Sequence, residues 1–177
     1  MKIEPASIEG AFIIQPSPVT DNRGQFVRLY DQGIFAKAGM CTEISQSSVS
    51  TNVQKGTLRG IHWQAAPYEE TKFVSCISGA IYDVLVDLRP ESSTYKAWMA
   101  LELTESNRCV LYVPAGVGHG FMTLTDNAHV FYQIGGVYTP EAARGCRWND
   151  PAFCIQWPST PTLMSQRDQT YADFVGQ

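Results

Sequence analysis

Residues 56–64 read GTLRGIHWQ, and residues 114–119 read PAGVGH. With Glu69 included, the first stretch has the spacing G-x5-H-x-Q-x4-E, and the second has P-x-G-x-x-H. Short strand-like runs surround both stretches, with turn residues about every 8–12 positions, which is typical of a sandwich or barrel built from strands. We therefore predict an all-β protein that carries two histidines in its strand framework.

The predicted strands are short runs rich in β-branched, aromatic and other apolar residues that end at Gly, Pro or Asn. They cover residues 11–15, 25–30, 56–63, 71–77, 80–88, 98–103, 109–113, 120–124 and 130–134. Residues 31–39 predict a short helix that ends at a glycine, and the Pro-rich tail from residue 151 predicts turns with a short helix. The chain shows no linker or repeat, so we expect one domain over residues 1–177.

Composition limits the classes of function. The net charge is -4, which disfavours nonspecific nucleic-acid binding because that mode needs a basic surface. No apolar run approaches the ~20 residues of a membrane span, and the first ten residues lack the apolar stretch of a signal peptide. Five cysteines without a C-x-x-C pair favour free thiols over a disulfide or zinc framework. We expect a cytoplasmic protein with no nucleic-acid or membrane partner.

The two histidine stretches resemble the two motifs of cupins, whose double-stranded β-helix, or jelly roll, holds a site inside the barrel. Metal-binding cupins usually carry H-x-H in the first motif, and here Gln64 takes the second position. A neutral amide is a poor substitute for the imidazole and carboxylate ligands that zinc, iron or manganese prefer. We therefore expect no metal. The chain has only three histidines, so a three-histidine site would need His62, His119 and His129 together.

A narrower resemblance extends from Asp21 to Asp168 in family order. The chain resembles the dTDP-4-dehydrorhamnose 3,5-epimerase family, metal-free cupins of sugar-nucleotide biosynthesis. The stretches that carry it are DNRGQF (21–26), KGTLRGIHWQ (55–64), KFVSCISGAIYDVLVDLRPES (72–92), VPAGVGHGF (113–121), VFYQ (130–133), YTPEAARGCRWNDPAF (138–153) and SQRD (165–168). The resemblance implies a cofactor-free isomerase that forms a homodimer. It would invert C3, C5 or both in a nucleoside-diphosphate-4-keto-6-deoxy sugar, as in dTDP-rhamnose biosynthesis.

Four residues match the catalytic positions of that family. Its reaction removes weakly acidic C–H protons beside a ketone, so it needs a base on one face, an acid on the other and a stabilised enolate oxygen. By this resemblance His62 is the base, Asp168 orients its ring and Tyr132 is the acid. Lys72 is the cation near the enolate oxygen. A neutral imidazole suits proton abstraction near neutral pH.

Further residues match substrate-binding positions of the family: Arg23, Gln46, Arg59, His119, Tyr138 and Arg167. The guanidinium groups of Arg23 and Arg59 suit a diphosphate, and Arg167 stands where a lysine is usual. Tyr138 matches an aromatic residue that stacks on the base.

The chain departs from the family pattern at three binding positions. Arg28 and Ala143 stand where Glu is common, and Ser48 stands where Asn is common. Because the catalytic set is intact, these changes indicate the same chemistry on an altered sugar or nucleotide, or drift within a subfamily.

Other interpretations of these residues stay open at this point. Tyr132 could pack in the core, Lys72 could be solvated and Asp168 could cap a helix, while Glu69 and Glu70 are interpreted as a solvated loop. Two other functions also fit. One is a metal-dependent cupin dioxygenase or isomerase with ligands among His62, Glu69, His119 and Gln64, and the other is a non-catalytic sugar-nucleotide-binding module.

Strand alternation makes a testable statement about the first motif. Leu58, Gly60 and His62 fall on one face of the strand and Arg59 on the other. Arg59 and His62 therefore reach one site only if the strand bulges near Gly60 or if Arg59 lies at the barrel mouth. In the later strand, Tyr132 shares its face with residues 130 and 134, and we expect that face to be the interior.

Overall fold

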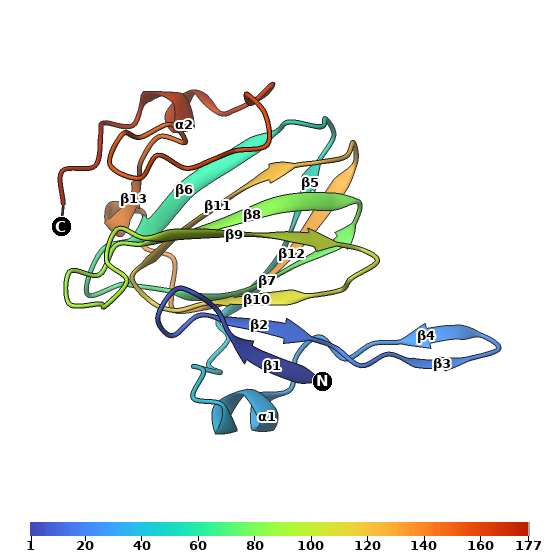
Figure 1. The fold of residues 1–177 in the computed structure, drawn as a ribbon. Coiled ribbons are helices and arrows are strands. Elements are labelled where there is room, and N and C mark those ends of the chain that lie inside the picture. The colour runs from blue at the N-terminus through green and yellow to red at the C-terminus, as the bar shows by residue number, and fades with distance from the viewer. Residues whose placement is uncertain (177) are drawn as a thin grey trace.

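The structure, a computed structural model, describes residues 1–176, and Gln177, the last residue of the predicted domain, lies outside the described residues. Two antiparallel sheets pack face to face (Figure 1). The six-stranded sheet contains, in spatial order, β1 (Lys2–Pro5), β2 (Phe12–Gln15), β10 (Val110–Val113), β7 (Thr71–Ser78), β12 (Ala128–Gly135) and β5 (Gln46–Asn52). The five-stranded sheet contains β13 (Ala143–Gly145), β6 (Leu58–Gln64), β11 (Val117–Thr123), β8 (Ala80–Asp87) and β9 (Trp98–Thr104). The predicted all-β jelly roll of the cupins is confirmed.

Eight of the nine predicted strands are confirmed with boundaries within three residues. The prediction for residues 25–30 is wrong beyond Phe26, because β4 (Gly24–Phe26) pairs only with β3 (Val19–Asp21) in a separate hairpin, so the next residues have no neighbouring strand. The strands β1, β3, β5 and β13 were not expected. Each is very short or rich in polar residues, so its apolar pattern is weak.

The two predicted short helices are confirmed. In α1 (Gln32–Lys37), the Asp31 carboxylate accepts a hydrogen bond from the Ile34 N–H and caps the first turn. Phe35 is fully buried and stacks on Phe73, with ring centroids 5.1 Å apart, which holds the helix against the six-stranded sheet. The tail contains α2 (Gln166–Thr170), and a 3-10 turn, η1 (Pro140–Ala142), precedes β13. None of the helices in residues 1–176 is long and apolar enough to cross a membrane.

The space between the sheets is filled in one part and hollow in another. Along β12, Val130 is fully buried in the apolar core, whereas Tyr132 and Ile134, on the same face, line a cavity. The expectation that this face of the strand points inward is therefore confirmed. The apolar core therefore fills the space around Val130, and the cavity begins at Tyr132 on the same strand face.

Candidate active site

The cavity has a volume of about 690 Å³ and is lined from both sheets and from the C-terminal tail. It brings together nine of the ten predicted site residues, which are Gln46, Arg59, His62, Lys72, His119, Tyr132, Tyr138, Arg167 and Asp168. The tenth, Arg23, lies in the β3–β4 hairpin, where its guanidinium pairs with Asp21 at 2.6 Å and its side chain is 86% exposed. Within this chain Arg23 therefore does not line the cavity.

A bulge in β6 brings Arg59 and His62 to the same cavity. The pairing of β6 with β11 shifts register between the His62–His119 pair and the Arg59–Phe121 pair. Gly60 lies inside this shift with a φ of 116°, and a Cβ there would stand 2.5 Å from the Gly120 Cα. Of the two alternatives that strand alternation left open, the bulge near Gly60 is confirmed, and only glycine fits this backbone.

His62 pairs with Asp168 across the boundary between β6 and α2. Its Nε2 lies 2.6 Å from the Asp168 Oδ1, and the His62 side chain is 40% exposed toward the cavity, whereas that of Asp168 is 5% exposed. Ser165 caps α2 by accepting a hydrogen bond from the Asp168 N–H, so the helix-cap interpretation of Asp168 is wrong. Burial opposes ionisation of Asp168, but hydrogen bonds from His62 and from the Gly60 N–H outweigh it and lower the pKa of the carboxyl group. The carboxylate therefore stays charged beside the imidazole.

A second imidazole–carboxylate pair lies next to the first. His119 is the cross-strand partner of His62, and its Nε2 lies 2.7 Å from the Asp83 Oδ1, with both side chains buried. Asp83 was not singled out from the sequence, although a lone carboxylate in the apolar run 80–88 was a usable signal. The pair orients the His119 ring at the cavity wall.

Tyr132 faces this second pair from the opposite sheet. Its ring meets the His119 ring edge-on, with centroids 5.9 Å apart and planes at 77°. Burial, together with the negative charge of Asp83, raises the pKa of Tyr132 well above its ordinary value. The phenol therefore keeps its proton at neutral pH and is able to act as a donor.

Lys72 is buried and forms an ion pair inside the site. Its Nζ lies 3.1 Å from the Glu70 Oε1, and the two side chains are 8% and 12% exposed. The interpretation of Lys72 as a solvated side chain is therefore wrong, as is the solvated-loop interpretation for Glu70; Glu69 is exposed as expected. An ammonium group has three donors, so this ion pair leaves donors of Lys72 available to a substrate oxygen.

The remaining candidates surround the cavity. The Arg59 Nε donates to the Oδ1 of buried Asn52 at 2.7 Å, which fixes the guanidinium near the sheet. The Arg167 guanidinium lies over the Tyr171 ring at 5.5 Å, and Tyr138 is 53% exposed. Two cationic groups and an exposed aromatic ring are thus available near the inner pairs, and such groups suit a diphosphate and a planar base.

Gln64, which takes the usual ligand position of metal-binding cupins, holds loops together. Its amide nitrogen donates to the carbonyls of Tyr68 and Val137, and its oxygen accepts from the Thr139 N–H at 2.7 Å. His129 pairs with Thr51 at the β5 edge and does not line the cavity. Within residues 1–176, no three His, Cys, Asp or Glu residues gather in a group able to hold a metal ion.

Of the three departures from the family pattern, Ala143 lines the cavity directly. Arg28 pairs with Asp31 at 2.9 Å next to α1. Ser48 lies in β5 opposite Tyr132 and is exposed. Ala143 is therefore the departure that changes the cavity wall of this chain.

Comparison with known proteins decides the family. The model of the dTDP-4-dehydrorhamnose 3,5-epimerase family matches residues 5–175. The chain belongs to this family. It is thus an isomerase that epimerises a sugar nucleotide, and the resemblance read from its motifs is confirmed.

Individual relatives agree with this membership. A dTDP-4-dehydrorhamnose 3,5-epimerase of Sinorhizobium fredii is 37% identical over 171 residues, covering 96% of this chain and 88% of the relative. A dTDP-4-dehydrorhamnose 3-epimerase of Streptomyces niveus is 38% identical over 170 residues, covering 96% and 82%. The crystal structure of the 3,5-epimerase from Elizabethkingia anophelis aligns with a TM-score of 0.94 at 32% identity, covering 98% of this chain and 96% of that one. The relatives of this epimerase therefore include enzymes named for one carbon and for two.

Proposed function

We propose that this epimerase inverts C3, C5 or both of a dTDP-4-keto-6-deoxy sugar, with His62 as the base and Tyr132 as the acid. The observation that carries the proposal is the placement of these two groups on opposite sheets: His62 lies on β6 and Tyr132 on β12, and both line one cavity. Inversion requires proton removal and return on opposite faces of one carbon. A proton acceptor on one side of the cavity, His62, and a proton donor on the other, Tyr132, would meet that requirement.

The proposed step begins with neutral His62, whose ring is oriented by Asp168. The imidazole takes the proton from the carbon beside the ketone, and the C–H electron pair moves into a C–C double bond as the ketone oxygen becomes an enolate oxygen. Lys72 stabilises this oxygen by charge and hydrogen bonding. The electron pair then returns to the carbon, which takes the phenol proton of Tyr132 on its other face. His62 loses its proton to solvent, Tyr132 regains one, and no cofactor is consumed.

The nucleotide part of the substrate is proposed to lie at the cationic side of the cavity. Arg59 and Arg167 would bind the diphosphate, because guanidinium groups pair with phosphate oxygens in a bidentate geometry. Tyr138, half exposed, offers a ring for the base, while Gln46 and His119 offer polar contacts within the cavity. We further propose that residues 1–177 act as one cytoplasmic domain without a metal, so activity should persist in a chelator.

The decisive experiment incubates the protein with dTDP-4-keto-6-deoxyglucose in heavy water and follows C3 and C5 by NMR. Wild-type protein should place deuterium at one or both carbons with inversion, and His62→Ala should abolish exchange at every carbon that the wild type labels. Asp168→Asn should lower the exchange rate about 100-fold or more with little change in KM, since it alters the base and not the substrate contacts. Exchange by His62→Ala at the wild-type rate would place the base elsewhere.

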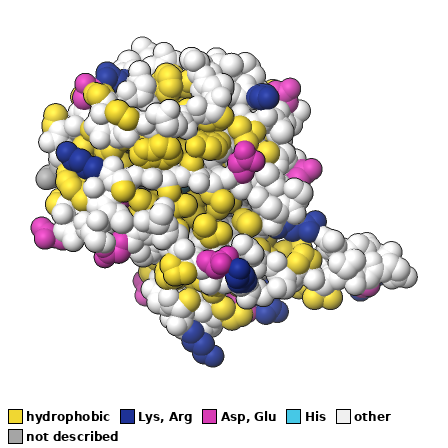
Figure 2. All heavy atoms as spheres, viewed as in Figure 1, with side chains coloured by type: hydrophobic (Ala, Val, Ile, Leu, Met, Phe, Trp, Pro, Cys, Tyr) yellow, Lys and Arg dark blue, Asp and Glu magenta, His cyan; other side chains and the backbone are white. Residues whose placement is uncertain are grey.

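A homodimer is the second part of the proposal, and the β3–β4 hairpin supports it. The hairpin extends away from the sheets (Figure 1), and Figure 2 shows it projecting beyond the body of the molecule. Val19 and Phe26 on it are 68% and 69% exposed, and large apolar side chains exposed on a protruding element favour an interface. Arg23 lies on the same hairpin, outside its own cavity. If it contacts substrate as the family resemblance implies, it does so in a second copy of the chain.

A further inference from the structure

We propose that Tyr171 is a positioning residue, whose ring holds His62 in the orientation that proton abstraction requires. The inference rests on the proposed role of His62 as the base. Tyr171 follows α2 directly, three residues after Asp168, and it lines the catalytic cavity. No motif of the chain pointed to it.

The surroundings of His62 show why a second constraint is needed. Its side chain is 40% exposed, and its hydrogen bond to Asp168 fixes one ring nitrogen but leaves the ring free to swing about that contact. The Tyr171 ring meets the imidazole edge-on, with centroids 6.0 Å apart and planes at 65°. An aromatic edge contact is directional, so the two contacts together define the plane of the imidazole.

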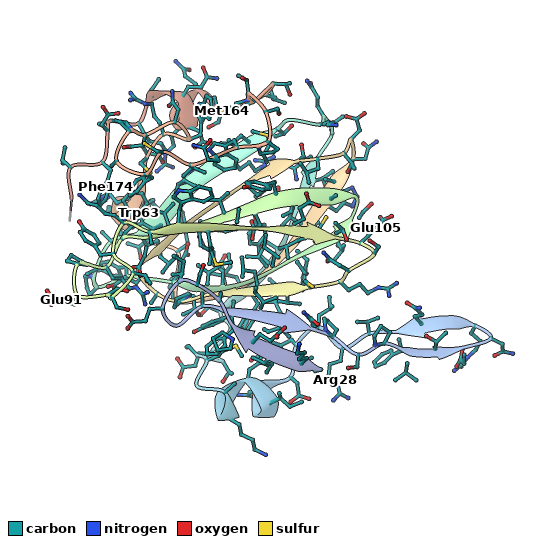
Figure 3. All side chains as sticks on the ribbon, viewed as in Figure 1. Arg28, Trp63, Glu91, Glu105, Met164 and Phe174 are labelled. Atoms are coloured by element: carbon teal, nitrogen blue, oxygen red, sulfur yellow. The ribbon has the colours of Figure 1, made fainter. Side chains whose placement is uncertain are left out.

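The fold places Tyr171 there by a close approach to the backbone. In the β13–β6 pair, Gly145 lies directly opposite His62. A Cβ on Gly145 would stand 2.4 Å from both Cε2 and Cζ of Tyr171, so the phenol end of the ring lies on a backbone surface that only glycine leaves free. The tail beyond is held by Phe174, whose ring lies 6.2 Å from that of Trp63, and Figure 3 shows these two side chains near each other.

The ring, and not the hydroxyl group, makes these contacts. The Tyr171 hydroxyl oxygen is buried and has no hydrogen-bond partner among the described residues. Burial raises the pKa of this phenol, so it stays neutral. On the ring itself, the Arg167 guanidinium lies 5.5 Å from the centroid. The Tyr171 ring thus contacts the base directly, whereas Arg167 lies over its face and is itself exposed.

Tyr171 also lines a second cavity. This second cavity, of about 520 Å³, lies under the tail, and Tyr171, Trp63, Ala143 and Arg144 line both. Removing the ring would enlarge the free space on the Tyr171 side of His62. The imidazole would then lose its packing contact and would sample orientations that do not point at the substrate carbon.

The test measures deuterium exchange and inversion for Tyr171→Ala, Tyr171→Leu and Tyr171→Phe, with thermal unfolding followed for each. We expect Tyr171→Ala and Tyr171→Leu to lower kcat about 10- to 100-fold, the loss expected for a displaced catalytic group, with KM changed less than about threefold. Tyr171→Phe keeps the ring and should retain at least half of the wild-type kcat. Tyr171→Leu keeps apolar bulk against Gly145, so it reports on orientation even if the alanine variant is unfolded.

Phe174→Leu is the matched control, since it weakens the same tail without touching His62, and it should lower the melting temperature but not kcat. A Tyr171→Leu variant with wild-type kcat would overturn the inference, as would a Tyr171→Phe variant as slow as Tyr171→Leu, which would assign the effect to the hydroxyl group. Undiminished exchange by His62→Ala alone would instead refute the proposed function, so the two failures are distinguishable.

Discussion

At the scale of single residues, the site contains two imidazole–carboxylate pairs with different access to the cavity. His62 and His119 are cross-strand neighbours, and each bonds an aspartate through Nε2. The His62 side chain is 40% exposed and that of His119 only 5%. A base must reach both the substrate and the solvent that takes its proton, so the greater exposure of His62 supports it as the base.

Tyr132→Phe should uncouple exchange from inversion. The change keeps the ring and its packing but removes the hydroxyl proton, while His62 and Lys72 still form the enolate. The proton returned by His62 then restores the original configuration. We expect inversion to fall at least about 100-fold while deuterium still enters the labelled carbon, measured by NMR in heavy water. Inversion at the wild-type rate would mean that Tyr132 is a packing residue.

At the scale of elements, the bulge in β6 shows how one glycine builds a site. Arg59 and His62 are three residues apart, a separation that puts side chains on opposite faces of a regular strand. The positive φ of Gly60 and its contact with Gly120 absorb the extra residue. Strand β6 thereby presents the side chains of both Arg59 and His62 to one cavity.

Gly60→Ala should destabilise the protein and separate these side chains. Its Cβ would stand 2.5 Å from the Gly120 Cα, in backbone that is unable to rotate away. We expect the free energy of unfolding in denaturant to fall by at least about 2 kcal/mol. Gly24→Ala is the control, because Gly24 also has a positive φ, 127°, but a Cβ there meets nothing within 4 Å. Equal losses in the two variants would contradict the close-packing argument.

The connection from β8 to β9 carries a pH-dependent part of the stability. Burial opposes ionisation of Asp87, yet hydrogen bonds from Arg89, Ser92 and Thr94 outweigh it and lower its pKa to about 2. A carboxyl pKa lowered by folding stabilises the protein above the unfolded value of 3.8. That stabilisation is lost as the pH falls toward 2.

Asp87→Asn should therefore lower the free energy of unfolding by roughly 2 kcal/mol at neutral pH. The difference in the free energy of unfolding between variant and wild type, measured by denaturant titration at each pH, should become smaller as the pH falls from 4 toward 2. A gap that is independent of pH over this range would show that the hydrogen bonds of Asp87 do not depend on its charge.

At the scale of the whole molecule, the hairpin connects oligomeric state with activity. Sedimentation should give twice the chain mass for wild-type protein and the single-chain mass for the double variant Val19→Ser, Phe26→Ser, because exposed apolar side chains are the proposed contact. A wild-type monomer would contradict the dimer.

Mixing variants tests where Arg23 acts. In a dimer formed from one His62→Ala chain and one Arg23→Ala chain, the cavity that retains His62 receives Arg23 from the other chain. Activity at low substrate concentration should therefore exceed that of either variant alone. If Arg23 serves its own cavity, the mixed dimer contains no complete site and mixing gives no gain.

The sequence by itself determined the jelly roll and most of its strands, and nine of the ten site residues predicted from it line the cavity. Apolar runs between turn residues indicate buried strands from local sequence alone. The motifs around His62 and His119 are also continuous stretches, so both patterns are readable without knowing which residues meet in space. The unpredicted strand β5 shows the limit of this: its sequence QSSVSTN has little apolar pattern, and it becomes a strand because β12 lies beside it.

The family resemblance implied the pairing of His62 with Asp168, whereas only the tertiary structure revealed the partners of His119 and Lys72 and the contact of Tyr171 with His62. Asp83 and Glu70 looked like a strand carboxylate and a loop carboxylate, and their roles come from His119 and Lys72, which they meet in space. Tyr171 reaches His62 because Gly145 leaves room on a paired strand, and Arg23 stays outside the cavity because its hairpin leaves the sheets. Ion pairs and ring contacts depend on distances between residues that are remote in the chain. Those distances are set by the fold, and the order of residues in a single sequence does not give them.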